Sequence, residues 1–214
     1  MTRIRKTDIP GVDRRVSLDD IREKGWPALF APDLDPPLRL VVEIGFGRGE
    51  FLRHMAEAEP ATAYVGVEIS RKRVLKMARR LARDEIGNVR LLAEPAQALL
   101  EEGLPDEGVA AFWVNFPDPW PKKRHHKNRL LQAPLVRQLA KRLAPGGQLE
   151  IATDHAEYAE HIAEVLRAET LLENLNAPAP YASEVPGRLH TAYEEMWRAD
   201  GRALHFFSYR RRLA

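Results

Sequence analysis

Cysteine is absent from the 214 residues of this chain, and long apolar runs are missing as well. Without cysteine the chain has no disulfide bonds, no thiolate metal ligands and no cysteine nucleophile, which fits the reducing cytoplasm. No stretch of about eighteen apolar residues, the length that a membrane-spanning helix needs, occurs anywhere. Residues 1–30 also contain no continuous apolar segment of the signal-peptide kind. We therefore expect a cytoplasmic protein with no membrane partner.

The net charge is also small: 33 basic and 31 acidic residues give a formal net charge of +2. Charges that cancel in the sum can still be separated in space, and binding to nucleic acid depends on the local field. Basic residues gather in three clusters, within residues 71–83, 122–129 and 210–212. Each cluster is either a solvated face or a surface for a polyanion.

Short apolar runs alternate with amphipathic segments of helical length from Leu38 onward, and this alternation predicts a parallel sheet with helices on both faces. We expect strands at 39–45, 63–69, 88–92, 109–116 and 147–153. We expect helices near 49–58, 70–84, 95–102, 127–143 and 155–168. After Glu169 two more strands, joined by a long connection, predict an antiparallel edge pair. The fold class is thus α/β, with a mostly parallel, seven-stranded sheet and an antiparallel C-terminal edge strand.

The length suits one globular domain, which we place at residues 31–214. Residues 1–30 are expected to form a basic, partly mobile arm, either a plain disordered terminus or a segment that reaches a polyanion. The sequence leaves open whether the protein is a monomer or a homodimer.

A glycine-rich turn follows the first expected strand, in VVEIGFGRGEF (residues 41–51). Gly45, Gly47 and Gly49 permit a tight turn and a close backbone approach at the start of a helix. The spacing departs from the dinucleotide fingerprint, whose third glycine would fall on Glu50. Glu43 would repel a pyrophosphate but attract the ammonium and sulfonium groups of S-adenosylmethionine. We therefore expect that cofactor here, with a simple strand-to-helix turn as the alternative.

Other cofactor contacts are expected at the ends of the next strands, because ligands of doubly wound sheets lie across the carboxyl ends of the strands. Glu68 ends the second strand, where such folds place an acid that binds ribose hydroxyls. Pro95 and Ala96 follow the third strand. Asp118 follows the fourth, in NFPDPW, where Pro117 and Pro119 restrict the backbone on either side of the carboxylate. Asp118 is therefore predicted beside the transferred methyl group, unless the segment is only a rigid surface turn.

The chain resembles the bacterial tRNA (guanine-N7)-methyltransferases, which are class I S-adenosylmethionine-dependent enzymes with a Rossmann-like fold. The resemblance rests on EIGFGRGEF, GVEIS, FPDPWPKKRHHKNRL, ATDHAEY and TAYEE, in this order across roughly residues 40–210. It implies methylation of guanine 46 in the tRNA variable loop, with Asp118 as the catalytic carboxylate. It further implies cofactor contacts and substrate contacts at the following residues: Glu43, Glu68 and Asp118 for the cofactor, and Lys122, Asp154, Thr191 and Glu194 for the target nucleoside.

Two positions depart from the family pattern. Pro95 stands where relatives usually carry an acid or an asparagine near the adenine, so Glu94 or a backbone N–H replaces that contact or the contact is missing. Asn128 replaces a common arginine, with Arg129 adjacent, which affects one phosphate contact. The rest of the basic run, together with Arg129, is expected to bind tRNA phosphates.

Local alternatives exist for several of these residues. Asp154 has the position of a helix N-cap, and Thr191 with Glu194 matches the spacing of a capping box. His125 is expected to contact RNA, because without cysteine or a supporting histidine no metal site is expected. Two other functions remain open: a class I methyltransferase for another substrate, and a non-catalytic RNA-binding protein that keeps a nucleotide pocket.

Overall fold

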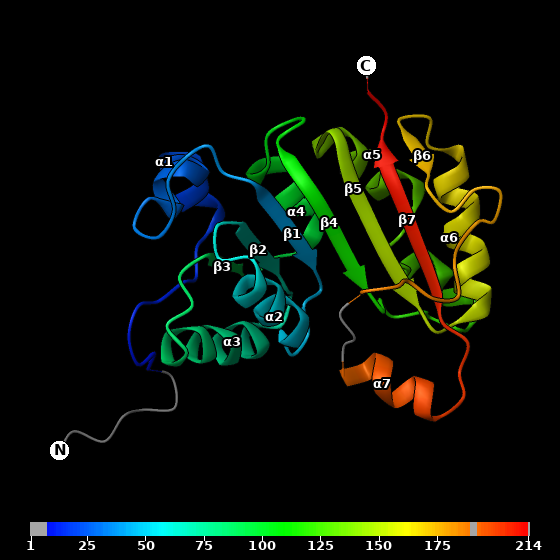
Figure 1. Ribbon diagram of the computed structural model, residues 1–214, viewed down its shortest axis with the longest axis horizontal. Coiled ribbons are helices and arrows are strands. Elements are labelled where there is room, and N and C mark those ends of the chain that lie inside the picture. The colour runs from blue at the N-terminus through cyan, green and yellow to red at the C-terminus, as the bar shows by residue number, and fades with distance from the viewer. Residues whose placement is uncertain (1–7, 189–191, 214) are drawn as a thin grey trace. The chain divides into compact units, whose positions relative to one another are not determined.

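The structure is a computed structural model that describes residues 8–188 and 192–213, with residues 192 and 193 described by their backbone alone. The chain divides into two compact units, residues 1–103 and residues 104–214. Figure 1 shows strands and helices in both units, from the blue end of the chain to the red one.

The first unit has three parallel strands: β1 (Leu40–Ile44), β2 (Ala63–Val67) and β3 (Val89–Leu92), with β2 in the middle. Every residue of these strands is buried, which explains why they are mostly apolar without alternation, with Glu43 and Arg90 as the charged exceptions. The helices that follow them are α2 (Glu50–Ala58), α3 (Arg71–Arg83) and the short α4 (Ala96–Ala98), which continues into a π-helical turn (Leu99–Gly103). Each strand and helix expected in this part of the sequence is present.

An additional helix, α1 (Leu18–Phe30), occupies the segment in which we expected a mobile arm. Ser17 and Asp20 form a capping box at its start, and Ile21, Trp26 and Phe30 are buried. The indole of Trp26 donates a hydrogen bond of 2.7 Å to the carbonyl of Gly103. The segment is packed from Arg14 on, because Arg14 and Val16 also exchange backbone hydrogen bonds with Leu91 on β3 (3.0 and 2.9 Å).

The second unit has four strands: β4 (Val109–Asn115), β5 (Leu143–Thr153), β6 (Leu172–Asn174) and β7 (His205–Arg211). Their order is β4-β5-β7-β6, in which β4 and β5 are parallel and β7 runs antiparallel to both β5 and β6. The expected antiparallel pair is therefore confirmed, with β6 outermost and β7 between it and β5. The helices are α5 (Ala133–Arg142), α6 (Ala156–Ala168) and α7 (Ala192–Ala199), besides a 3-10 helix, η2 (Lys123–Asn128).

Two boundaries differ from expectation. The single helix expected over 127–143 is η2 followed by α5, because Arg129 leaves the helical region and Pro134 starts a new helix in its first turn. Strand β5 starts at Leu143, before Gly146 and Gly147, whereas the expected strand started at Gly147. Gly146 has a φ of +79° there, and the pairing with β4 shifts between Val109 and Ala111. The glycines thus bend the strand instead of preceding it.

The predicted α/β class, with mostly parallel strands and an antiparallel C-terminal pair, is confirmed. Among the described residues, no helix combines the length and apolar character that crossing a bilayer demands.

Candidate active site

The turn after β1 is built from three left-handed glycines: φ is +72° at Gly45, +56° at Gly47 and +74° at Gly49. A side chain at Gly49 would place its Cβ 2.5 Å from Sδ of the buried Met77, so this glycine is required by packing. At Gly45, in contrast, no heavy atom of the described residues other than its chain neighbours lies within 4 Å of the position a Cβ would take. The turn therefore has open space above Gly45, where another molecule can approach the backbone.

Two acids flank this turn in the first unit. Glu43, on β1, is 4% exposed. Glu68, directly after β2, is 5% exposed, and its carboxylate accepts hydrogen bonds from the backbone N–H of Gly47 (3.1 Å) and of Ser70 (2.9 Å). Arg73 adds an ion pair of 3.2 Å to the same carboxylate from a half-exposed side chain. Glu68 thus fixes the glycine turn to the start of α3, and Arg73 covers it from the solvent side.

Pro95 and Ala96 begin α4. Pro95 is the N-cap residue, is exposed and provides no side-chain hydrogen bond, as its chemistry dictates, whereas Ala96 is 7% exposed. Glu94, one residue earlier, is half-buried. These are the positions at which the sequence places the adenine contact.

The segment 116–120 after β4 has an unusual backbone. Phe116 and Trp120 both have positive φ, of +51° and +44°, which bulky residues rarely adopt. Two tertiary hydrogen bonds hold the segment: Phe116 N donates to the carbonyl of Ala152 (2.8 Å), and Nε of Arg129 donates to the carbonyl of Pro119 (2.9 Å). Asp118 lies between these anchors and is exposed. Its carboxylate is therefore presented to solvent by a backbone that is fixed on both sides.

Arg129 is not available for phosphate binding, which corrects the expectation for this one member of the basic run. It is 3% exposed, lies over the ring of Tyr158 (4.9 Å) and pairs with Glu157 (3.4 Å). The remaining basic residues of the run are exposed, and they are Lys122, Lys123, Arg124 and Lys127. The basic run therefore divides into one buried arginine that supports the Asp118 segment and four cations that face solvent.

His125 is half-buried in η2, and its ring makes an edge contact with Trp120 (5.8 Å between ring centres). Its backbone N–H donates to the carbonyl of Lys122 (2.7 Å). Trp120 therefore packs on this turn with 37% of its surface exposed.

Asp154 follows β5 and forms an ion pair of 2.8 Å with Arg202. It is not the cap of α6, because His155 has that role: its Nδ1 accepts a hydrogen bond from the backbone N–H of Tyr158 (3.2 Å). The interpretation of Asp154 as a helix cap is therefore wrong. Its side chain, 15% exposed, points from the carboxyl end of β5 toward the segment after α7.

Glu194, on α7, is fully buried and pairs with two arginines, Arg188 at 3.5 Å and Arg198 at 3.1 Å. Arg188 is itself 3% exposed in its side chain, and its Nη2 donates to Oδ1 of Asn115, the last residue of β4 (2.5 Å). Thr191, and with it the expected capping box, lies outside the described residues. Sequence reasoning missed Arg188, because a lone arginine in a long connection carries no local signal of burial.

Metal binding has no candidate among residues 8–188 and 192–213, where no group of three or more histidines and carboxylates is arranged to hold an ion.

Solved structures similar to this one include methyltransferases. The antibiotic-resistance methyltransferase Kmr aligns with a TM-score of 0.60 at 18% identity, covering 93% of this chain and 94% of its own. The 16S rRNA methyltransferase KamB aligns with a TM-score of 0.60 at 17% identity, covering 85% and 90%. A family model described as "Putative methyltransferase" matches residues 38–207. Fold and family model together define the class as methyltransferase.

Sequence relatives narrow the class. A tRNA (guanine-N(7)-)-methyltransferase of Alkalilimnicola ehrlichii is 39% identical over 87% of this chain and 84% of its own. Proteins of the same name from Thiobacillus denitrificans and Rhodococcus jostii are 43% and 46% identical, over 80% and 77% of this chain and 75% and 67% of theirs. The chain belongs to the tRNA (guanine-N(7)-)-methyltransferase family.

Proposed function

We propose that this protein transfers a methyl group from S-adenosylmethionine to N7 of guanine 46 in the variable loop of tRNA. The observation that carries the proposal is the segment 116–120, in which an exposed carboxylate is fixed between two left-handed residues beside four solvent-facing cations. Backbone strain of this kind costs about 1–3 kcal/mol for each residue and is concentrated at functional sites. Membership of the family, given above, supports the reaction type.

The cofactor is assigned to Glu43, Gly45, Gly47, Glu68, Pro95, Ala96 and Asp118. The residues of the first unit suit it, because the open space above Gly45 allows a close approach and two buried acids flank the turn. Glu43 attracts the ammonium group. Glu68 accepts hydrogen bonds from the ribose hydroxyls with its remaining lone pairs, after the exposed side chain of Arg73 has moved aside. The bound cofactor supplies an electrophilic methyl group on a sulfonium.

Guanine N7 is a bare lone pair, so no general base has to remove a proton before methylation. The guanine ring gains positive charge as N7 is methylated, and a fixed carboxylate beside the ring stabilises that charge. Asp118 has this role. Because the segment is fixed at Phe116 and Pro119, little reorganisation is needed when the charge develops.

The substrate is assigned to Lys122, His125, Asp154, Thr191 and Glu194. Carboxylates accept from N1–H and the exocyclic amine of guanine, which suits Asp154 and Glu194. Glu194 is buried between Arg188 and Arg198, which lie 3.5 Å and 3.1 Å from its carboxylate. Lys122 and His125 lie on the turn that follows Asp118 and are assigned to the RNA backbone and the flanking base.

The test combines labelled donor and bulk tRNA with the variants Asp118→Ala and Asp118→Asn. Both should lower kcat by roughly 100- to 1000-fold at unchanged thermal stability. Asp106→Asn is the control, since Asp106 is an exposed acid of the same unit that pairs with Arg142. Near-normal turnover by Asp118→Ala, or label in protein or small molecules instead of tRNA, would exclude the proposed function.

The position in tRNA is tested separately. A tRNA transcript with guanine 46 should be labelled and then cleaved at that nucleotide by borohydride and aniline, which break the chain at N7-methylguanine. A transcript with adenine 46 should accept no label. Cleavage at another guanine would retain the reaction type and overturn the position.

A further inference from the structure

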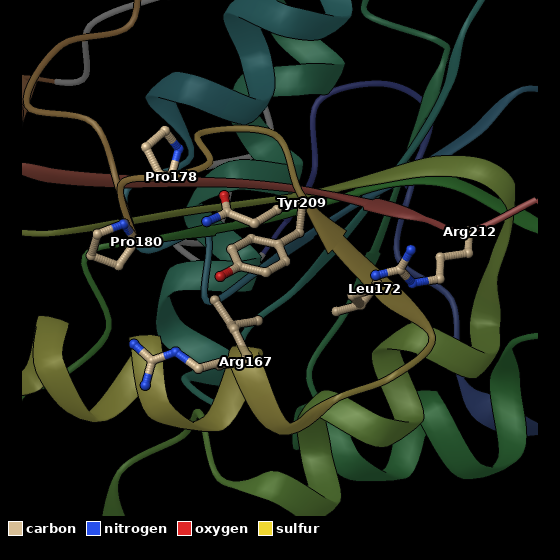
Figure 2. A pocket seen from close by; sticks show the side chains of 8 residues that line it. Arg167, Leu172, Pro178, Pro180, Tyr209 and Arg212 are labelled. Carbon is tan, nitrogen blue, oxygen red and sulfur yellow. The ribbon is translucent and has the colours of Figure 1, made fainter.

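A cavity of about 250 Å³ lies in the second unit, where β6 and β7 meet the end of α6. Figure 2 shows its side chains, with Tyr209 between Arg167 on one side and Arg212 on the other. The lining residues are Leu166, Arg167, Leu172, Asn174, Pro178, Pro180, Tyr209 and Arg212. None of these eight residues is acidic, and Arg167 and Arg212 place positive charge at the cavity.

Tyr209 is 4% exposed, and within the described part of the chain its hydroxyl makes no hydrogen bond. In Figure 2 the hydroxyl points into the cavity, toward the end at which Arg167 and Pro180 lie. Burial raises the pKa of Tyr209, although Arg167 lowers it in part. The hydroxyl therefore keeps its proton and is available to donate a hydrogen bond to a ligand in the cavity.

Arg167 supplies a cation at the same end. Its side chain is exposed and forms no ion pair with any described residue. Its place in the last turn of α6 gives it a favourable interaction with the helix carbonyls but does not engage its five donors. Arg212 is less available, because its Nε donates to the carbonyl of Thr170 (3.1 Å) and Glu173 lies 3.9 Å from its Nη1.

We infer that this cavity is a binding site for a phosphate group. The planar guanidinium of Arg167 matches a phosphate with paired donors, and Tyr209 adds a third donor from the buried side. Leu166, Pro178 and Pro180 line part of the cavity and reduce the access of water to such a group, which strengthens its contacts. A carbon chain or sugar attached to the phosphate fits the remaining volume.

This phosphate is not that of the methylated nucleotide. Tyr209 pairs with Leu149 in the sheet, whereas Thr153, which precedes Asp154, pairs with His205. Four residues of strand separate the two positions, about 13 Å at the usual rise of 3.3 Å. The phosphate group therefore comes from one of two sources: the tRNA backbone away from the target base, or a free phosphate compound.

The first experiment measures thermal unfolding with inorganic phosphate, with uridine 5′-monophosphate and with uridine. The wild type should be stabilised by the two phosphates and not by uridine. Arg167→Gln and Tyr209→Phe should bind them roughly tenfold more weakly. Without ligand, Tyr209→Phe should unfold at the temperature of the wild type, because the hydroxyl makes no hydrogen bond within the described residues. Lys141→Gln, which removes an exposed cation on α5, is the charge-matched control and should respond as the wild type does.

The second experiment measures the Kd for tRNA with the same variants. A Kd raised several-fold by Arg167→Gln, but not by Lys141→Gln, identifies the tRNA backbone as the source. An unchanged Kd together with lost phosphate stabilisation identifies a free phosphate compound. The inference is overturned if the phosphates do not stabilise the wild type, or if they stabilise wild type, Arg167→Gln and Tyr209→Phe equally. Neither experiment measures methyl transfer, so the phosphate site is tested independently of the proposed function.

Discussion

Arg188 and Glu194 form an ion pair inside the second unit, with side chains that are 3% and 0% exposed. Arg188 also donates to Asn115 at the end of β4, three positions before Asp118 in the sequence. This arginine therefore connects the strand that carries the Asp118 segment to the helix that carries Glu194. The connection is remote in sequence, since Asn115 and Arg188 are 73 residues apart.

Arg188→Met should lower the free energy of unfolding by about 3 kcal/mol, because it removes a buried cation from a fully buried carboxylate. Arg198→Met is the matched control, since Arg198 pairs with the same Glu194 from a side chain that is 31% exposed. Removing it should cost roughly 1 kcal/mol. Urea unfolding of both variants measures the difference, and equal costs would show that burial of Arg188 does not determine the strength of the pair.

Gly45→Ala and Gly49→Ala should separate binding from folding. Both positions have positive φ, so each alanine costs roughly 1–2 kcal/mol of strain. Only Gly49→Ala adds an overlap with Met77, for a total of about 2–4 kcal/mol. Gly45→Ala should fold but bind S-adenosylmethionine at least tenfold more weakly, because its methyl group fills the open approach. Calorimetric titration and thermal unfolding test this, and full affinity in Gly45→Ala would remove the turn from the cofactor site.

Glu150 predicts a pH dependence of stability. Burial raises the pKa of Glu150, and the hydrogen bond from Ser208 and the charge of Arg188 lower it in part. Since its folded pKa lies above the unfolded one, Glu150 stabilises the protein when protonated, and this contribution is lost as pH rises through the folded pKa. Glu150→Gln should therefore match the wild type near pH 4 and exceed its unfolding temperature at pH 7. A difference between the two proteins that does not grow with pH would contradict the assignment.

Arg129 and Lys123 should affect different quantities, although both belong to the same basic run. Lys123→Gln removes an exposed cation and should reduce the slope of log K against log salt for tRNA binding by roughly 0.7–0.9. Arg129→Met removes the hydrogen bond to Pro119 and should reduce kcat with an unchanged slope. Binding measured between 50 and 200 mM salt, beside single-turnover rates, separates the two effects. A reduced slope in Arg129→Met would mean that this arginine reaches RNA after all.

Local patterns explain what could be predicted from the sequence. Buried strands such as β2 are continuous apolar runs, and the amphipathic period of α3 with Ser70 as its cap fixes that helix to within one residue. The glycines after β1 require left-handed backbone, so their turn was predictable as well. These signals all lie within a few residues of the structure they determine.

Long-range partners explain what the sequence did not reveal. Arg129 lies among exposed cations in the sequence, and only its contacts with Pro119 and Tyr158 make it a buried support. Asp154 has the sequence position of a cap, but Arg202, 48 residues later, pairs with it and His155 caps the helix instead. Burial of a charged side chain depends on its tertiary partners, and no periodicity in the sequence records them.

The position of β7 between β5 and β6 affects how the chain can fold while it is being synthesised. Residues 172–174 leave the ribosome before residues 205–211, yet they hydrogen-bond in the sheet to β7. Strand β6 therefore has no partner in the sheet until β7 has been synthesised. The last strand to be made is inserted into the sheet rather than added at its edge, so translation must pass Arg211 before the sheet of this unit can close.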